Sequence, residues 1–554
     1  MQRNQTVPAW AGALAGLVSG GVALGIAQLV AGFVRPEAFP VLAVADATVD
    51  LSPAPVVEFA KETFGFYDKP VLVGGVLVVL ALVAAAIGVL SLRRRLAYGF
   101  AGLGVFGVVG ALAVVTRPDS AGVMDVLPTA AGVAAGAWTL SWLVRRAAGD
   151  RAQPAGTAGG AQTAGTAGRG AQATDAARAT DHGVPSAGGT VSSAGVVPSA
   201  VDRRRLLTGV AGGVVVAGAS AALGWQVGER RTVSAARVSL ALPKPTTPAK
   251  PIPAGSDLRI SGLSPFVTKN QDFYRIDTAL IVPQVDPNRW KLRIHGMVDR
   301  PIEITYADLL KMPLTEADVT LTCVSNEVGG DLVGNARWLG VRMAEVLRQS
   351  GLQANADMLL STSADGFTCG TPVDVVMDGR DALFAVAMNG EVLPVDHGFP
   401  VRQVVPGLYG YVSATKWVVD IKVTRFDRDQ AYWTPRGWSA MGPIKTQSRI
   451  DVPRQGDSLK AGRTTIAGVA WAQHTGIDAV EVRVDRGDWR EARLAQVPGP
   501  DTWRQWSLDW NATPGQHTIQ VRATDASGYT QTEQQAPPAP DGATGWHTIS
   551  VRVA

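Results

Sequence analysis

The chain contains two cysteines, and Cys323 lies where a reactive or metal-binding thiol could act. It lies inside a β-like run in the stretch TLTCVSNEVGGDLVGNARW, residues 320–338, and Asn326, Gly329 and Gly330 follow it closely. A thiolate is a nucleophile and a soft ligand for metals. A free cysteine can also fill a core as a small apolar side chain. The stretch by itself leaves both roles open.

A second stretch gathers cationic side chains in an apolar setting. Residues 388–417, MNGEVLPVDHGFPVRQVVPGLYGYVSATKW, contain His397, Arg402 and Lys416 among apolar, Pro and Gly residues. Arginine offers a planar fork of donors and lysine a compact charge, and both suit phosphate. Lysine and arginine in loops are usually solvated, so each alone is weak. Their apolar setting favours a binding site for an anion.

The elements that would position these residues have mixed patterns between residues 257 and 440. WKLRIHGMV, residues 290–298, predicts a strand, and ITYADLLKM, residues 304–312, predicts a short helix. Thr305 and Asp308 have capping-box spacing at the start of that helix. GVRMAEVLRQSG, residues 340–351, predicts a helix that ends at Gly351. The mixture indicates an α+β domain.

The last part of the chain, residues 441–554, alternates with the period of strands. Val480 and Val482 face one way and Glu481 and Arg483 the other, and the runs 519–523 and 549–553 repeat the pattern. DRGDW and DASGY are turn signals in this region. We expect an Ig-like antiparallel β-sandwich of about 100 residues.

The first 150 residues contain four long apolar runs, and a fifth lies further on. Each of the first four is near the ~20 residues that cross a bilayer. Arginines flank the runs in a way that places the N-terminus inside the cytoplasm and everything after Trp225 outside the cytoplasmic membrane. A net charge of +4 is too small to argue for nucleic acid as a partner. The runs are Trp10–Val34, Val71–Leu92, Ala97–Val115, Val123–Val144 and Leu206–Trp225.

Composition separates these parts. Residues 1–146 form the predicted four-helix membrane segment, and residues 147–202 are a low-complexity Ala/Gly/Thr/Ser tract expected to be a disordered cytoplasmic linker. Residues 203–228, beginning RRRLLTGVAGG, fit simple positive-inside anchoring and also a twin-arginine signal anchor, which exports folded proteins. Residues 229–256 are a Pro-rich spacer, expected to be extended and to lift the soluble part away from the bilayer.

The two stretches carry a resemblance to the sulfite oxidase family of molybdopterin enzymes, which covers residues 257–554 but no membrane segment. The resemblance implies a molybdopterin-binding domain over residues 257–440 and a dimerisation domain over residues 441–554. It implies that Cys323 is the protein ligand of molybdenum and the catalytic thiolate. By the same likeness, the further residues implied to bind the cofactor are Asn270, Phe273, Tyr274, Thr362, Asp365, His397, Arg402, Ala414, Thr415 and Lys416.

The second cysteine, Cys369, allows two interpretations. An exported protein could pair it with Cys323 in a disulfide. A Cys323 that binds molybdenum before export could not form that bond, so we expect Cys369 to be a reduced thiol without a catalytic role.

The sequence also departs from the family pattern. Where animal and plant sulfite oxidases carry an arginine near the metal-binding cysteine, this chain has Glu327; their active-site tyrosine aligns with Phe367, and an arginine before the first asparagine aligns with Lys269. Such cationic and phenolic groups hold an anionic substrate. Two substrate classes therefore stay open, a small sulfur oxyanion and a neutral sulfoxide such as methionine sulfoxide.

The positions of the histidines and tryptophans bear on the electron partner and on a non-catalytic alternative. The six histidines lie outside the apolar runs, which indicates no haem in this chain and a separate partner, a c-type cytochrome or a quinone-linked membrane protein. We also expect a homodimer. The alternative is a surface binding protein that uses the tryptophan-rich sandwich, although its tryptophans suit a core and a dimer face better. These tryptophans are Trp471, Trp489, Trp503, Trp506 and Trp510.

Overall fold

The computed structural model describes most of the chain outside one long tract and a few short gaps. Residues 149–202, which hold nearly all of the predicted linker, lie outside the described residues, as do Arg3 and His182. The chain divides into two compact units, which are described separately below. The described residues are 8–53, 56, 59, 63–64, 68–117, 120, 122–148, 203–230 and 233–554.

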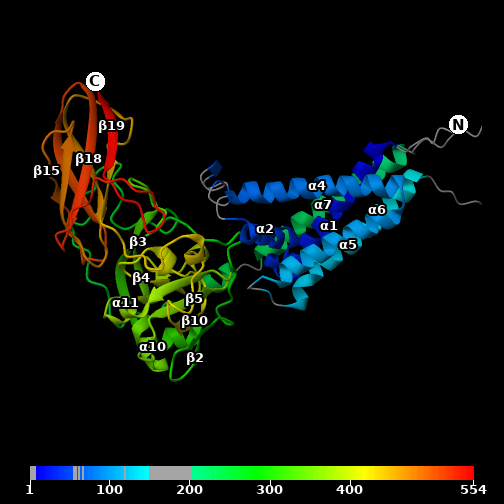
Figure 1. Ribbon diagram of the computed structural model, residues 1–554, viewed down its shortest axis with the longest axis horizontal. Helices are drawn as coiled ribbons and strands as arrows, with labels where there is room; N and C mark the ends of the chain where they lie inside the picture. The colour runs from blue at the N-terminus through cyan, green and yellow to red at the C-terminus, as the bar shows by residue number, and fades with distance from the viewer. Residues whose placement is uncertain are drawn as a thin grey trace, which may run out of the picture. The chain divides into compact units, whose positions relative to one another are not determined.

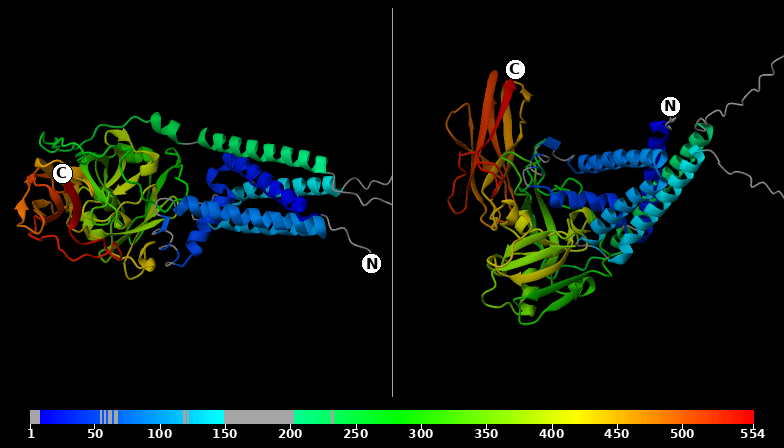
Figure 2. Two further views of the ribbon diagram at one scale, coloured as in Figure 1. Left: turned by 90° about the horizontal axis from the view of Figure 1, so that it is seen from above. Right: turned by 45° about the vertical axis from the view of Figure 1, so that its right-hand side comes forward.

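Five helices are long and apolar enough to cross a membrane. They form one bundle, in which residues of α1, α6 and α7 share a core that includes Val18, Leu143 and Leu206 (Figures 1 and 2). They coincide with the five predicted apolar runs. The helices are α1 (Ala9–Val34), α4 (Asp68–Arg93), α5 (Leu96–Val115), α6 (Leu127–Ala148) and α7 (Arg203–Arg230).

Small residues let these helices approach one another closely. A Cβ on Gly16 of α1 would meet the backbone of Ala84 in α4, and one on Gly132 of α6 would meet the backbone of Ala23. Helices in lipid associate through such small-residue contacts, because lipid chains are as apolar as the helix surfaces. Gly16 and Gly132 are therefore packing positions.

The segment between α1 and α4 contains regular structure. It holds η1 (Pro36–Ala38) and α2 (Pro40–Leu51), and η3 (Val123–Val126) precedes α6. Arg35 pairs with Asp125 at 3.3 Å, and Arg117 pairs with Asp46 at 3.1 Å. These ion pairs join segments that are far apart in the sequence.

Two sheets build the α+β part. The first has the strand order β2-β1-β10-β5-β6, in which β1 and β10 are parallel and the other pairs antiparallel. The predicted strand at residues 290–298 is β1, and β10 lies beside it in the centre (Figure 1). The strands are β1 (Lys291–Gly296), β2 (Ile302–Thr305), β5 (Met358–Ser363), β6 (Thr368–Pro372) and β10 (Val418–Thr424).

The second sheet carries the candidate cysteine. Its order is β3-β4-β7-β8, β9 pairs with β7 off this path, and every pair is antiparallel. A buried core with Leu292, Val341 and Ile421 joins residues of both sheets. The strands are β3 (Leu314–Thr322), β4 (Val333–Arg342), β7 (Leu383–Met388), β8 (Glu391–Val392) and β9 (Arg402–Val404).

The short helices begin and end at the residues that the sequence indicates. The Thr305 hydroxyl accepts a hydrogen bond from the Asp308 amide at 3.2 Å, which caps α9 (Tyr306–Lys311). Gly351, with φ of 69°, ends α10 (Met343–Ser350), and residues 340–342, predicted as helix, belong instead to β4. The remaining short helices are α8 (Ser234–Val238) and α11 (Val373–Met377). In the Pro-rich spacer, Thr247 forms a β-bridge with Thr315 of β3.

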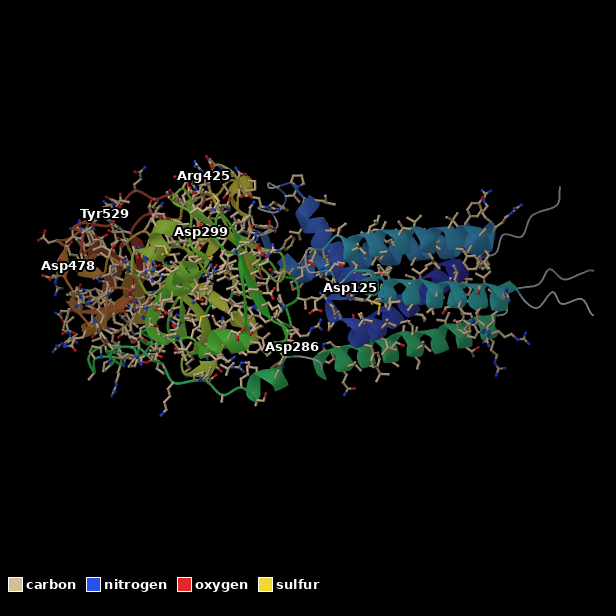
Figure 3. The ribbon with its side chains drawn as sticks, turned by 90° about the horizontal axis from the view of Figure 1, so that it is seen from below. Asp125, Asp286, Asp299, Arg425, Asp478 and Tyr529 are labelled. Atoms are coloured by element: carbon tan, nitrogen blue, oxygen red, sulfur yellow. The ribbon has the colours of Figure 1, made fainter. Side chains whose placement is uncertain are left out.

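The C-terminal part has two sheets, with the orders β11-β13-β17-β16 and β12-β19-β18-β14-β15. Asp478 and Tyr529 lie at its surface (Figure 3). The expectation of purely antiparallel pairing is wrong at one place, because β12 and β19 run parallel. The strands are β11 (Gln447–Val452), β12 (Ser458–Leu459), β13 (Gly462–Trp471), β14 (Ile477–Val484), β15 (Arg490–Glu491), β16 (Arg493–Leu494), β17 (Arg504–Ala512), β18 (Gly515–Asp525) and β19 (His547–Val553).

The tryptophans of this part have three different environments. Trp506 and Trp510 belong to the core shared by its two sheets. Trp471 and Trp503 instead pack in a cluster with Phe266 and Val333. Trp489 is half-buried under the guanidinium of Arg522, 4.3 Å from the ring centroid. The four buried tryptophans are therefore packing residues.

Candidate functional site

Cys323 directly follows β3 and begins the loop that connects it to β4. Its amide donates to the Leu332 carbonyl at 3.0 Å, which closes the loop, and its thiol is buried. Gln473 braces the preceding strand, since its side-chain amide donates to the Thr320 carbonyl and to the Thr322 hydroxyl, both at 3.0 Å. The end of β3 thus holds the thiol in a fixed place.

The polar and glycine residues after the cysteine shape this loop. The Asn326 side chain accepts the Leu332 amide at 2.8 Å, so one side chain ties both ends of the loop. Gly329 has φ of 81°, and a Cβ there would collide with the ring of His547 in β19. A Cβ on Gly330 would lie 2.7 Å from the Asn326 side-chain oxygen. Asn326, Gly329 and Gly330 therefore allow a tight loop that is held by hydrogen bonds between its two ends.

Arg402 in β9 is a buried cation without a carboxylate. Its Nη1 donates to the His397 carbonyl at 3.1 Å and its Nε to the Gln403 carbonyl at 3.3 Å, while the Trp338 ring lies 5.0 Å from the guanidinium. Within the described part of the chain, no acidic side chain forms an ion pair with it. Burial lowers the pKa of Arg402 to about 10, so the group stays charged at neutral pH. Such a cation is costly to bury unless an anion compensates it.

Lys416 lies beside Arg402 at the start of β10. Gly398, with φ of 111°, permits this approach, since a Cβ there would lie 3.0 Å from Cβ of Arg402 and 3.1 Å from Cα of Lys416. The Lys416 ammonium donates to the Asp277 carboxylate at 3.1 Å and to the Asp396 carbonyl at 3.2 Å. Burial lowers the pKa of Lys416 to about 8, although Asp277 acts in the opposite direction.

His397 connects the cationic segment to the loop that contains Asn270. Its Nε2 lies 2.9 Å from the Asn270 carbonyl, which can only accept, so Nε2 carries the proton. Its Nδ1 is then an acceptor, and this buried atom has no hydrogen-bond partner among the described residues. Burial lowers the pKa of His397 to about 4, which keeps the ring neutral. Phe273 packs edge-on against it at 5.6 Å.

The Tyr274 hydroxyl lies near Gly410, since a Cβ added to that glycine would be 4.0 Å from it. Burial raises its pKa far above the ordinary value, Cys323 raises it further and Arg402 opposes the change. The phenol is therefore neutral throughout the physiological range. It stacks on Phe273 with ring centroids 5.2 Å apart.

Cys369 and Thr415 lie close together, and Cys369 also lies near Gly410. The Cys369 thiol is fully buried, lies 3.8 Å from the Gly410 carbonyl, and both cysteines are free. Burial raises the pKa of Cys369 to about 12, so it is an inert thiol. Thr415 lies close to it, but the buried Thr415 hydroxyl has no hydrogen bond of ordinary geometry to any described residue.

Three further predicted residues, Ala414, Asp365 and Thr362, make hydrogen bonds or strand pairs with residues other than Cys323 and Arg402. Ala414 donates its amide to the Gly410 carbonyl at 2.9 Å, which fixes the loop before Lys416. Asp365 is in the β5–β6 turn, where it accepts the Phe367 amide at 3.2 Å and the Thr278 hydroxyl at 3.4 Å. Thr362 is paired within β5, opposite Asp420 and Thr368, and in the described structure no side-chain hydrogen bond connects it to the other candidates.

These groups together suit an anionic, hydrogen-bonding cofactor. The cradle offers a guanidinium that donates to two carbonyls but has no counter-anion, next to a buried thiol. It also offers a buried imidazole acceptor and a buried hydroxyl, which have no hydrogen-bond partner among the described residues. Buried polar atoms are nearly always satisfied, so a cluster of unsatisfied ones indicates a bound group. Molybdopterin, with its phosphate and pterin ring, fits this donor set.

Two residues with a part in the site were missed from the sequence. Asn389, with φ of 54°, opens the turn before β8; its side chain donates to the Asn270 side chain and to the Thr268 carbonyl, both at 2.8 Å. The Asn-Gly pair at 389–390 is a hairpin signal that could have placed this turn. Asp277, which binds Lys416, has no local signal, because its partner is distant in the sequence.

Comparison with known proteins shows which protein family the chain belongs to. The model of the oxidoreductase molybdopterin binding domain matches residues 279–433. The uncharacterized oxidoreductase YuiH of Bacillus subtilis is 31% identical over 157 residues, which are 28% of this chain and 76% of that protein. The chain belongs to the sulfite oxidase family of molybdopterin oxidoreductases.

Other members of the family match a longer part of the chain. Mitochondrial sulfite oxidase of Homo sapiens is 30% identical over 321 residues, 49% of this chain and 58% of that protein. The chain thus spans little more than half the length of that relative. The structure of the sulfane dehydrogenase SoxCD from Paracoccus pantotrophus, at 24% identity, covers 52% of this chain and 82% of its own with a TM-score of 0.45.

The positions that depart from the family pattern lie in different surroundings. Glu327, which takes the place of an arginine, is exposed in the loop after Cys323. Phe367, at the position of the active-site tyrosine, is half-buried and packs on Tyr432 with ring centroids 5.6 Å apart. Neither residue brings a cation or a phenol to the site.

Proposed function

We propose that the protein is a membrane-anchored molybdopterin-dependent oxidoreductase of sulfite oxidase type. The observation that carries the proposal is the buried Arg402 guanidinium without a carboxylate, in one cradle with the Cys323 thiol and the unpartnered polar atoms of His397 and Thr415. An empty protein gains nothing from such an arrangement, because each of these groups is costly to bury alone. Family membership supports the same assignment.

Each residue would have a distinct part in holding the cofactor. Cys323 would bind the metal through its thiolate, a soft anionic donor. Arg402 and Lys416 would hold the phosphate, and the neutral His397 would accept a hydrogen bond from the pterin. The cofactor supplies two-electron oxygen-atom transfer, while the protein orients it. The phenol of Tyr274, neutral and beside the thiol, is placed to donate a hydrogen bond toward the reacting centre.

The substrate that this site favours is a small sulfur compound, and within that class a neutral sulfoxide. An anionic substrate needs cations beside the reacting atom, as in oxyanion-binding sites generally. Glu327 is an acid where the family has arginine, and Phe367 lacks a hydroxyl. Sulfite is the second candidate, because the chain belongs to the sulfite oxidase family.

The location follows from the five apolar helices. We place the catalytic part on the outer face of the cytoplasmic membrane, after the fifth span, with a separate c-type cytochrome or quinone-linked protein as electron partner. The length and composition of the helices support membrane anchoring. The two-sheet C-terminal part would be an Ig-like dimerisation domain, with residues 257–440 as the catalytic domain.

Metal and pterin content tests the proposal directly. Purified full-length protein should carry about one molybdenum and one pterin per chain, and Cys323→Ser should keep the fold while losing activity. Turnover of sulfite and of methionine sulfoxide, compared at equal enzyme, then selects the substrate. A matured wild-type protein with neither metal nor pterin would favour the non-catalytic alternative, a binding protein that uses residues 441–554.

A further inference from the structure

A carboxylate outside the predicted cofactor site lies at the centre of several cations. The Asp277 carboxylate accepts Nε of Arg275 at 2.9 Å and Nζ of Lys416 at 3.1 Å, and its other oxygen lies 3.1 Å from Nζ of Lys69. Lys69 begins α4 and belongs to the same compact unit as Asp277. The Asp277 side chain is 6% exposed, so these contacts are shielded from water.

The balance of charges keeps Asp277 ionised. Burial by itself would raise its pKa, but the charges of Lys416, Lys69 and Arg275 outweigh burial and hold the pKa well below its ordinary range. Lys416, Lys69 and Arg275 pair with two carboxylates, Asp277 and Asp396, so these ion pairs leave one net positive charge. A dianionic phosphate can therefore approach Lys416 without net repulsion from Asp277.

The Lys416 ammonium is only partly used by these contacts. Two of its three donors go to Asp277 and to the Asp396 carbonyl, and the Trp417 ring lies 5.3 Å from Nζ. Among the described residues no further acceptor takes the third donor. With two donors fixed, the direction of the third is fixed as well, which lowers the entropy cost of binding a ligand.

The segment that carries Asp277 is itself anchored on both sides. Arg275 reaches the Asp396 carboxylate at 3.6 Å, and the Thr278 hydroxyl donates to Asp365 at 3.4 Å. Asp277 is thus held in place by its neighbours in sequence, independently of Lys416. A fixed carboxylate can position a lysine, whereas a mobile one would follow it.

We propose that Asp277 is a positioning residue that orients the Lys416 ammonium for the phosphate of the cofactor and keeps it protonated. The inference rests on the proposed function. Asp277 does not touch the cofactor; it acts through Lys416. The competing idea is that Asp277 is a substitute anion, which occupies the place of the phosphate and must leave when the cofactor binds.

The experiment measures how fast the cofactor leaves full-length, detergent-solubilised protein purified with its cofactor. The variants are Asp277→Asn, Asp277→Glu and the matched control Asp396→Asn, which removes another carboxylate that pairs with Arg275 but not with the Lys416 ammonium. Released pterin is followed by the fluorescence of its oxidised form at pH 7 and pH 9, and thermal unfolding checks the fold.

The variants should differ in the rate at which they release pterin. Asp277→Asn should release pterin about tenfold faster at pH 7, the size expected from one lost hydrogen bond to a charged group. Its release should accelerate at a lower pH than in the wild type. Burial and the charges of Arg402 and Arg275 lower the pKa of Lys416, whereas Asp277 raises it. Without Asp277, Lys416 should therefore lose its proton at a lower pH. Asp277→Glu should recover most of the retention, and Asp396→Asn should match the wild type.

Two results would overturn the inference. Release from Asp277→Asn at the wild-type rate would leave Asp277 without a role in retention, and slower release would make it the competing anion. Should Asp277→Asn fail to fold, Asp277→Glu decides, because a carboxylate that positions Lys416 predicts release near the wild-type rate, whereas a longer competing anion predicts faster release. A wild type without pterin would refute the proposed function itself, which is a separate result.

Discussion

At the scale of single residues, Arg402 is unusual because its charge is buried without a partner anion. Removing it should therefore cost the empty protein little. For Arg402→Met, produced in a host that makes no molybdopterin, we expect the unfolding free energy to change by less than ~1 kcal/mol, since a lost buried charge offsets lost contacts. In a host that makes the cofactor, the same variant should lose most of its pterin.

Arg337 provides the matched control for that variant. It pairs with the nearly buried Asp318 at 2.8 Å. Arg337→Met leaves this carboxylate unpaired and should cost about 3 kcal/mol in urea unfolding. If Arg402→Met lost as much in the empty protein, Arg402 would be a structural clamp rather than a site for an anion.

His547 should make the stability of the protein depend on pH. Burial lowers its pKa from 6.5 to about 4, and its Nδ1 accepts the Ile450 amide at 2.9 Å. Below pH 6.5 the unfolded chain takes up a proton that the folded chain does not, so this contribution is full above that pH and is lost on acidification toward pH 4.

Urea unfolding at pH 7 and pH 5 measures this contribution. The wild type should lose about 2 kcal/mol from His547 alone between these pH values. His547→Gln keeps an acceptor but cannot titrate, so its loss between pH 7 and pH 5 should be smaller by that amount. Equal losses in the two proteins would show that folding leaves the pKa of His547 unchanged.

At the scale of elements, the β3–β4 loop depends on a glycine that no other residue can replace. Gly329→Ala adds the strain of φ at 81° and a clash with the His547 ring. We expect a loss of about 1–3 kcal/mol together with a lower molybdenum content. Gly456→Ala is the control, because Gly456 has φ of 82° but nothing within 4 Å of the added Cβ. Equal losses in the two variants would mean that the contact with His547 contributes nothing.

Local patterns predicted the elements well where the signal is local. Thr305 and Gly351 mark the ends of their helices in the sequence, and the valines of β14 alternate as a strand requires. The helix α2 was missed, because Pro36 and Pro40 at its start suggest a loop as readily as a helix start. The parallel β12–β19 pair has no local signature at all.

The site was predictable to the extent that residue type and motif defined it. The residue types of Cys323, Arg402 and Lys416 and the resemblance of their segments to the family single them out in the sequence, and their assignment to the site stays a prediction. Asp277 and Asn389 act on partners more than 100 positions away, at Lys416 and Asn270. Only a folded chain reveals such contacts.

At the scale of the whole molecule, the three arginines that begin α7 can be tested for their role in export. Replacing all of Arg203, Arg204 and Arg205 by lysine preserves the positive charge that orients a membrane helix, but removes the paired arginines of an export signal. We expect the C-terminal part to become inaccessible to protease added to intact cells, while the wild type is cleaved. Unchanged cleavage would show that these arginines are not an export signal and act only through their positive charge.

The contact between Gly329 and His547 also bears on the order of events during biosynthesis. The loop that presents Cys323 packs against β19, a strand that leaves the ribosome long after it. Until that strand has been made and added to its sheet, the loop lacks one of its walls. Maturation of the proposed metal centre would then wait until β19 has been made, and a product truncated before β19 should lack the cofactor.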